Sequence, residues 1–238
     1  MPPKPGRYLP CFGRRTGGRM SDAVTVRPKD WVPFRCRLCG SCCRNLRGNL
    51  MPEQVDAYRL ARFLRERGEV EYMEDFYTNY TYPDMLEGFF PVFLMHTTDP
   101  DNSCVFLKDG RCSVYEARPR VCRLYPFTAF PGQREKAFNF FQCMDSHSAH
   151  FSDGKILVKD WMYQNFSRED REFLTAESDN LLTLGQLFKA LGPDRLKENL
   201  FQILYYRYYN FDLDQPFMPQ YEENTEELKR ILQNIVGR

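Results

Sequence analysis

The sequence predicts an α+β protein, with a small cysteine-rich domain of hairpins and irregular loops followed by a helical C-terminal region. Three observations lead to this expectation. The chain has 238 residues, enough to bury a core without disulfides. Eight of its nine cysteines lie between Cys36 and Cys143. From about residue 160 onward the apolar residues recur at the spacing of helices.

The composition is that of an ordinary globular protein. Hydrophobic residues make up 42% of the chain, charged residues 27%, and the formal net charge is +1. This balance gives no reason to expect a nucleic acid or a membrane as partner. A run of about eighteen apolar residues, which would predict a membrane helix, does not occur in the sequence.

Residues 1–22 are expected to form a disordered basic tail. The first twenty residues carry five basic residues and no acidic one, and they lack the apolar stretch of a signal peptide. A cytoplasmic location is therefore expected, where clustered cysteines more often indicate metal or redox chemistry than structural disulfides. A basic arm that binds RNA or lipid is the alternative for the tail. Cys11, which lies in it, is given no role.

The segment after the first group of cysteines is expected to begin with a helix. Residues 51–68 have an apolar face, with Pro52 suited to the first turn and Gly68 to the C-terminal end. Residues 69–100 are acidic, aromatic and interrupted by prolines, which predicts short helices and loops.

A hairpin is predicted over 104–115, because two short apolar runs flank Asp109-Gly110. With these two residues in the turn, Leu107 faces Cys112 across the strands. Cys104 would then lie on the opposite face, since side chains alternate along a strand. Cys104 and Cys112 can share one metal only if Cys104 lies in the loop before the hairpin.

Two further elements are expected around the last cysteines. Pro119 and Pro126 leave room between them for a single helical turn that carries Cys122. Residues 137–143 alternate in a way that predicts a strand ending at Cys143.

The C-terminal part is expected to be helical. The stretch 167–170 resembles a capping box with Asp in place of Glu. Gly192-Pro193 is a helix stop, and 194–210 and 225–236 have helical periodicity, the latter with Thr225 as N-cap.

The first cysteines form a ladder of potential metal ligands. Cys36, Cys39 and Cys42 follow the C-x2-C-x2-C spacing that bacterial ferredoxins use for three corners of an iron–sulfur cluster. Tetrahedral zinc also uses C-x2-C, although usually as two separated pairs. A fourth ligand must come from elsewhere.

Cys43 does not fit this ladder, because adjacent side chains diverge in both helices and strands. It can reach the same site as Cys42 only at an irregular turn, or it serves a second site. Cys122 is the first choice for the fourth ligand. The distant candidates as a group are Cys104, Cys112, Cys122 and Cys143.

Arginines accompany both cysteine groups. The residues are Arg35, Arg37, Arg44, Arg47, Arg111, Arg118, Arg120 and Arg123, and no acid occurs between residues 35 and 47. Four thiolates around zinc or an iron–sulfur core leave a net negative charge that guanidinium groups would offset. For any one of these arginines, an ordinary surface role is the alternative.

Several other chemistries lack their motifs. The C-x3-C-x2-C ligands of a radical enzyme that uses S-adenosylmethionine (SAM) are incomplete, because Leu46 occupies the third position. No phosphate-binding or dinucleotide-binding glycine motif occurs. His147 and His150 follow Cys143 at a spacing that suits a metal pair, but they are interpreted as polar surface or capping residues.

The pattern resembles a known family. CRLCGSCCR, a following helix and CVFLKDGRCSVYEARPRVCRLYPF are similar to the YkgJ-type cysteine-cluster (CxxCxxCC) family, described as zinc- or iron-chelating. The resemblance covers residues 36–143. It extends distantly to the cysteine region of flagellin lysine-N-methylases, which are associated with an iron–sulfur centre. The tail and the region after residue 150 are not covered.

The prediction is therefore a metal-binding domain over 23–150 with a helical region over 151–238 packed on it. Its cofactor is expected to be a [4Fe–4S] cluster or Zn²⁺. The alternatives are a cluster-dependent group-transfer or redox enzyme, such as a protein lysine methyltransferase that uses SAM, and a zinc-stabilised interaction module with a protein partner. The candidate metal ligands are Cys36, Cys39, Cys42, Cys43, Cys104, Cys112, Cys122 and Cys143.

Overall fold

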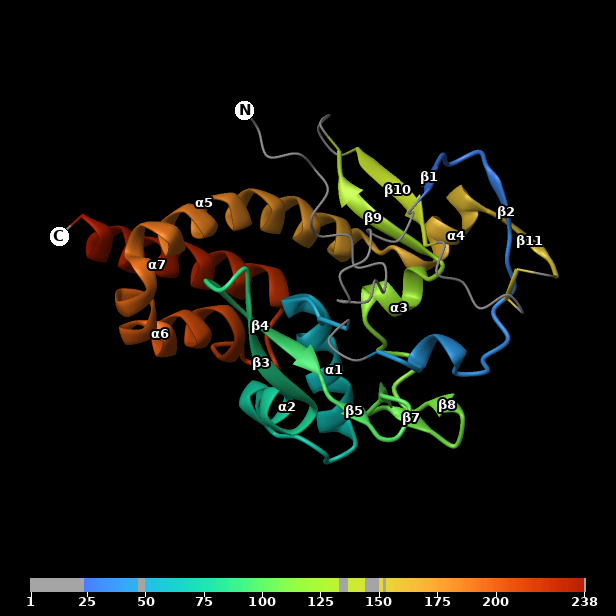
Figure 1. Cartoon of the computed structure of the whole chain (residues 1–238), viewed down its shortest axis with the longest axis horizontal. Coiled ribbons are helices and arrows are strands. Elements are labelled where there is room, and N and C mark those ends of the chain that lie inside the picture. The colour runs from blue at the N-terminus through green and yellow to red at the C-terminus, as the bar shows by residue number, and fades with distance from the viewer. Residues whose placement is uncertain (1–23, 47–49, 133–136, 144–149, 152, 238) are drawn as a thin grey trace. The chain divides into compact units, whose positions relative to one another are not determined.

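The structure, a computed structural model, has the predicted α+β fold (Figure 1). It describes residues 24–46, 50–132, 137–143, 150–151 and 153–237. The tail with Cys11, and also Arg47 and His147, lie outside the described residues.

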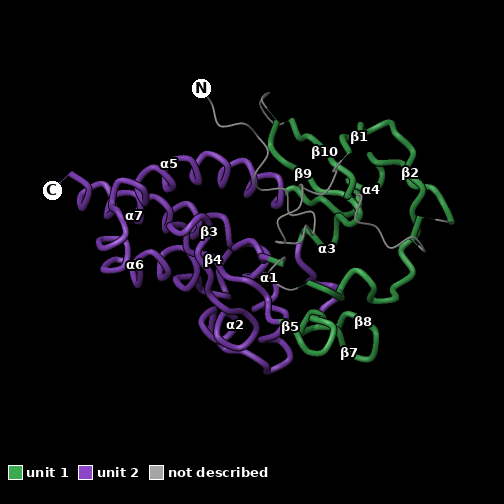
Figure 2. Tube along the Cα trace, in the orientation of Figure 1, with its two compact units in different colours: residues 1–50, 97–113, 120–168 green, residues 51–96, 114–119, 169–238 purple. Residues whose placement is uncertain are grey.

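Two compact units interleave along the chain (Figure 2). Unit 1 contains residues 1–50, 97–113 and 120–168, and unit 2 contains residues 51–96, 114–119 and 169–238. The boundary near residue 150 stays a prediction. In the described part of the chain, no helix is both long and apolar enough to cross a bilayer.

Unit 1 consists of small antiparallel sheets and short helices. Its largest sheet has the order β1-β10-β9, with Val26 opposite Phe140 and Phe140 opposite Ala129. The strands of this sheet are β1 (Val24–Val26), β9 (Phe127–Pro131) and β10 (Phe138–Gln142). The other strands pair as β2 (Trp31–Pro33) with β11 (Lys155–Leu157), β5 (Thr97–Thr98) with β6 (Ser103–Cys104), and β7 (Leu107–Lys108) with β8 (Arg111–Cys112). The helices are the 3-10 turn η1 (Ser41–Cys43), α3 (Arg120–Leu124) and α4 (Val158–Asn165).

An aromatic cluster forms the core of unit 1 beside the first cysteines. Phe34 is 2% exposed. Its ring lies 5.4 Å from that of Trp161 and 5.7 Å from that of Tyr125, both in edge-to-face contact. Because Phe34 is two residues before Cys36, this packing anchors the start of the cysteine loop.

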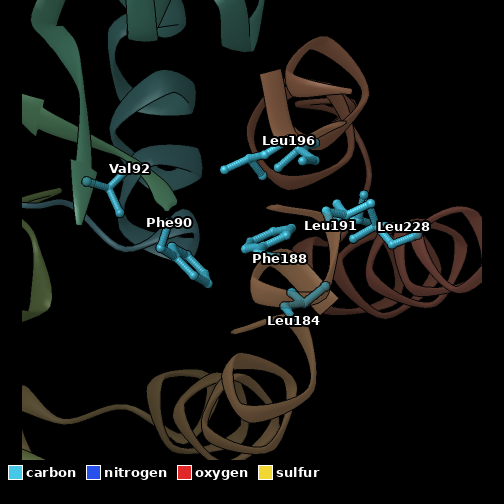
Figure 3. Packing of buried hydrophobic residues seen from close by; sticks show 9 residues of the cluster. Phe90, Val92, Leu184, Phe188, Leu191, Leu196 and Leu228 are labelled. Atoms are coloured by element: carbon cyan, nitrogen blue, oxygen red, sulfur yellow. The ribbon is translucent and has the colours of Figure 1, made fainter. Parts of the chain in front are cut away.

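Unit 2 is mainly helical and contains one long hairpin. Its helices are α1 (Gln54–Glu66), α2 (Met73–Tyr80), α5 (Arg168–Glu198, with its first residue assigned to unit 1), α6 (Leu200–Leu204), a π-helix (Tyr205–Tyr209) and α7 (Phe217–Val236). Its strands are β3 (Thr81–Leu86) and β4 (Phe90–Met95). Phe90 of β4 packs edge-to-face on Phe188 of α5, with ring centroids 5.0 Å apart, and leucines from α5 and α7 complete the cluster (Figure 3).

Several locally determined predictions are confirmed. Asp109 and Gly110 have φ of 48° and 75°, and they form the predicted turn between β7 and β8. Gly68 has φ of 70° just beyond the end of α1. Its N–H donates to Arg65 O while the N–H of Glu69 donates to Leu64 O, which is the Schellman arrangement. Gly192, with φ of 71°, interrupts α5 at the predicted stop.

Other predictions differ from the structure. Residues 69–100 contain the β3–β4 hairpin as well as a helix, because strand pairing there depends on distant packing. Thr225 is buried inside α7 and is not its N-cap, because Pro216 precedes the first helical residue. Pro52 lies before the N-cap Glu53, so it is outside the first turn of α1.

A buried ion pair links the helices of unit 2. Arg207, in the π-helix, donates from Nη2 to Glu177 Oε1 of α5 at 2.7 Å. Tyr221 of α7 donates its hydroxyl to the other oxygen of Glu177 at 2.6 Å. Arg207 is 5% exposed. The carboxylate therefore connects three helical segments inside the core.

Replacing this carboxylate is expected to destabilise unit 2. Glu177→Gln preserves the shape but leaves the Arg207 charge buried without its counterion, which costs about 3 kcal/mol. The measurement is the unfolding free energy from far-UV circular dichroism in urea. Glu222→Gln, at an exposed position of α7, is the control and should change stability little. Equal stability of the two variants would contradict the structural role of the pair.

Candidate metal centre

All eight cysteines of the described residues belong to unit 1 and none forms a disulfide. Cys104 and Cys143 are buried, whereas Cys36 and Cys39 are exposed. The remaining four thiols, of Cys42, Cys43, Cys112 and Cys122, are partly buried. These eight are the residues that the sequence predicts as metal ligands, and unit 2 contributes no described cysteine.

An irregular turn separates the second and third members of the cysteine ladder. Gly40 has φ of 68°, in the left-handed region, and η1 follows it directly. The N–H of Cys43 donates to the Gly40 carbonyl at 2.9 Å, which closes the turn. As a result, the sulfurs of the adjacent Cys42 and Cys43 lie 4.0 Å apart. This is the irregular backbone that the sequence requires if both are to reach one site.

Main-chain hydrogen bonds tie the end of this loop to the segment before Cys104. Asn45 N–H donates to Asp101 O at 3.0 Å, and Leu46 N–H donates to Asn102 O at 2.9 Å. The Arg44 guanidinium also pairs with the Asp101 carboxylate at 2.5 Å. Cys42 and Cys43 are thereby held close to a part of the chain about 60 residues away.

Gly40 fits tightly against the β7–β8 hairpin. A Cβ at this position would lie 2.7 Å from Leu107 Cδ1 and 2.8 Å from the carbonyl oxygen of Gly110. Both distances are shorter than van der Waals contact, so only glycine allows the approach. The contact places the first cysteine loop on the hairpin that carries Cys112.

The later cysteines occupy three different elements. Cys112 in β8 faces Leu107, as predicted. Cys104 is outside this hairpin because it pairs with Thr97 in the β5–β6 ladder. The alternation rule that would separate Cys104 from Cys112 therefore does not apply. Cys122 lies in α3 as expected. Cys143 directly follows the predicted strand, and its N–H donates to Pro126 O at 2.8 Å.

The loop thiols have unequal affinities for protons. A hydrogen bond with Ser41 lowers the pKa of Cys39. A hydrogen bond from Cys43 lowers the pKa of Cys42 to about 7, while the same bond and burial raise the pKa of Cys43. Cys122 and Cys104 also raise the pKa of Cys43 by their charge. Burial raises the pKa of Cys104 to about 11. The two cysteine groups are therefore close enough to interact electrostatically.

The first cysteine of the ladder borders an open hollow of about 460 Å³. Arg35, Cys36, Arg37, Leu38 and Asp153 line it. Solvent therefore reaches Cys36 directly.

His150 is a buried neighbour of the cysteine loop, which corrects its interpretation as a polar surface or capping residue. It is 4% exposed, and its Nε2 lies 3.0 Å from Cys39 Sγ. The spacing from Cys143 was a usable signal in the sequence. This spacing does not reveal that the ring is buried, because burial of a polar ring depends on tertiary packing.

Two arginines of the cysteine loop form ion pairs with acids that are distant in sequence. Arg37 pairs with Asp153, and Arg44 pairs with Asp101. Of the later group, Arg120 and Arg123 donate to the carbonyls of Ala129 and Asn165. The two ion pairs therefore leave less net positive charge beside a metal–thiolate centre than the sequence indicates.

The first cysteine loop brings possible metal ligands together two at a time. Among the residues that the structure describes, no group of three or more His, Cys, Asp or Glu side chains is close enough to hold a metal ion as it stands. The short contacts of the cysteine loop include those of Cys42 with Cys43 and of Cys39 with His150.

Comparison with known families identifies the cysteine region. Residues 35–147 match the model of the CxxCxxCC family, described as "Putative zinc- or iron-chelating domain". No curated protein and no solved structure matches the chain. The match spans all eight cysteines of unit 1 and supports metal binding. Residues 35–147 are therefore similar to the CxxCxxCC cysteine-cluster family.

Proposed function

We propose that unit 1 is a metal-binding module that holds zinc or iron through cysteine thiolates. The observation that carries this proposal is the fixing of the first cysteine loop to the later cysteine segments. Hydrogen bonds to Asp101 and Asn102 and the close approach of Gly40 to Gly110 gather unbridged thiols from distant parts of the chain. Without an inorganic centre, so many adjacent thiols have no evident structural use.

The side chains available as metal ligands are of the chemical types that bind zinc or iron. Thiolates are preferred ligands of both metals, and imidazole suits both as well. Two thiolates on one tetrahedral zinc ion lie about 3.8 Å apart, given Zn–S bonds of about 2.3 Å. The separation of 4.0 Å between the sulfurs of Cys42 and Cys43 is close to this value. A bound ion would cross-link the first cysteine loop to the later cysteine segments of the chain.

The short distance between the Cys42 and Cys43 sulfurs favours two ligands of a single ion over ligands of two different irons in a cluster. In a [4Fe–4S] cluster each cysteine binds a different iron, so ligand sulfurs are farther apart than on one ion. The spacing of Cys36, Cys39 and Cys42 favours the cluster, which remains the second candidate. We propose Cys42 and Cys43 as ligands of one ion. The other members of the family pattern, Cys36, Cys39, Cys104, Cys112, Cys122 and Cys143, are candidates for the remaining positions and for a second site.

Anaerobic purification distinguishes the two candidates. The expected result is zinc or iron at about one ion or more per chain, with no acid-labile sulfide and none of the broad visible absorption of iron–sulfur clusters. A brown protein that contains sulfide would replace the single-ion proposal with the cluster. Protein free of both metals, which also takes up neither from solution, would contradict the proposed function.

Loss of a loop thiolate is expected to release metal. Cys42→Ser should weaken metal binding by more than about 100-fold, because even loss of a supporting residue costs 10–100-fold. It should also lower the stability of unit 1, since metal binding is coupled to folding. Metal content and tryptophan fluorescence during unfolding measure the two effects, because Trp31 and Trp161 both lie in unit 1. Cys11→Ser, outside the family match, is the control and should behave as wild type.

The tight contact of Gly40 offers a test that leaves every thiol in place. Gly40→Ala introduces backbone strain and a clash with Leu107 and the Gly110 carbonyl, and is expected to cost about 2–3 kcal/mol. Gly110→Ala is the matched control. Its φ of +75° gives the same strain, but the new Cβ would meet nothing within 4 Å. Metal affinity and the unfolding of unit 1 are measured for both variants, and the difference between them reports the contribution of the Gly40 contact. Equal values for the two variants would contradict a role for this contact.

A further inference from the structure

We propose that His150 is a metal ligand and that it acts together with Cys39 in the centre proposed above, so that this inference rests on the proposed function. The family match ends at residue 147, so His150 lies outside it. The proposal starts from the contact of 3.0 Å between His150 Nε2 and Cys39 Sγ.

The imidazole is held in one orientation before any metal binds. Its ring makes edge-to-face contacts with Phe34 and Tyr125, with centroid distances of 6.1 Å and 6.0 Å. Its main chain is fixed as well, because the His150 carbonyl accepts a hydrogen bond of 2.9 Å from Arg35 N–H. Arg35 immediately precedes Cys36, so the start of the cysteine loop and His150 are held together. Preorganisation of this kind is typical of ligand side chains.

The contact distance suits two ligands of one ion. Zn–N and Zn–S bonds of about 2.0 Å and 2.3 Å place the two donor atoms about 3.5 Å apart in a tetrahedral site. The observed distance is 3.0 Å, so the two atoms need to move only slightly farther apart to bind one ion. Ser41 Oγ, 3.1 Å from Cys39 Sγ, contacts the same sulfur and positions it.

Together with the Cys42–Cys43 pair, this contact gives three thiolates and one imidazole. Cys42 and Cys43 lie in η1, and Cys39 directly precedes its N-cap Gly40. Three cysteines and one histidine are an established ligand set of structural zinc. The two pairs do not converge on one point as they stand, so metal binding would have to draw them together.

The charges around the loop favour this set over four thiolates. Zn²⁺ with three thiolates and a neutral imidazole has a net charge of −1, whereas four thiolates give −2. Arg37 and Arg44 are already paired with Asp153 and Asp101. These two charges are therefore already balanced, and the less negative centre costs less to bury.

The test uses the full chain loaded with Co²⁺, which reports ligand type through its visible spectrum. We expect tetrahedral bands in the wild type, and affinity for Co²⁺ and Zn²⁺ at least about 10-fold weaker in His150→Ala. His150→Cys should restore tetrahedral binding and add the charge-transfer absorption of one more thiolate. His96→Ala, in unit 2, is the matched control and should leave affinity and spectrum unchanged.

The outcomes separate the two proposals. A wild-type chain that binds neither ion overturns the proposed function and this inference with it. A wild type that binds while His150→Ala has the same affinity and spectrum overturns only the role of His150.

A second measurement covers the case in which His150→Ala does not fold. In wild-type protein labelled with ¹⁵N-histidine, Zn²⁺ should shift the Nε2 resonance of His150 and leave that of His96 in place. Resonances are assigned with His96→Ala and His147→Ala. An unchanged His150 resonance in zinc-loaded protein would overturn the inference.

Discussion

The attachment of the first cysteine loop to residues 101–110 is the constraint on which the site depends. Two main-chain hydrogen bonds and one ion pair fix Arg44, Asn45 and Leu46, while Gly40 fits against the hairpin turn. These contacts use main-chain groups, one Arg–Asp ion pair and the absence of a side chain at Gly40, so they define position without using any thiol. The sulfurs are thus left available for a ligand. A disulfide-based fold would have used them for the attachment itself.

Local chemistry made part of this structure predictable. The turn at Asp109-Gly110 requires positive φ, Gly68 ends a helix in the left-handed region, and two prolines confine α3. Each feature depends on a few adjacent residues, which the sequence displays directly. The α+β class and the family follow from the same kind of signal, namely spacing and periodicity.

Features that depend on distant contacts were not predictable. The β3–β4 hairpin pairs segments whose composition suggested loops, and burial of Thr225 follows from how α7 packs. His150 is the most consequential case. Its spacing from Cys143 was visible, but its value as a donor depends on Phe34 and Tyr125 closing around the ring. Likewise Asp101 and Asp153, which neutralise the loop arginines, are distant in sequence from the arginines they pair with.

The interleaving of the two units gives a metal in unit 1 an effect on unit 2. The chain leaves unit 1 at residue 50, forms α1 to β4 of unit 2, and returns at residue 97. An ion that links Cys43 to His150, as proposed above, would close a loop of about 107 residues, which in the chain-entropy account of cross-links contributes about 5 kcal/mol. The cross-link restricts the unfolded state of the whole enclosed segment. The effect therefore does not depend on the contacts that this segment makes in the folded protein. Metal release would therefore widen the unfolded ensemble of α1, α2 and the β3–β4 hairpin as well as that of the cysteine loop.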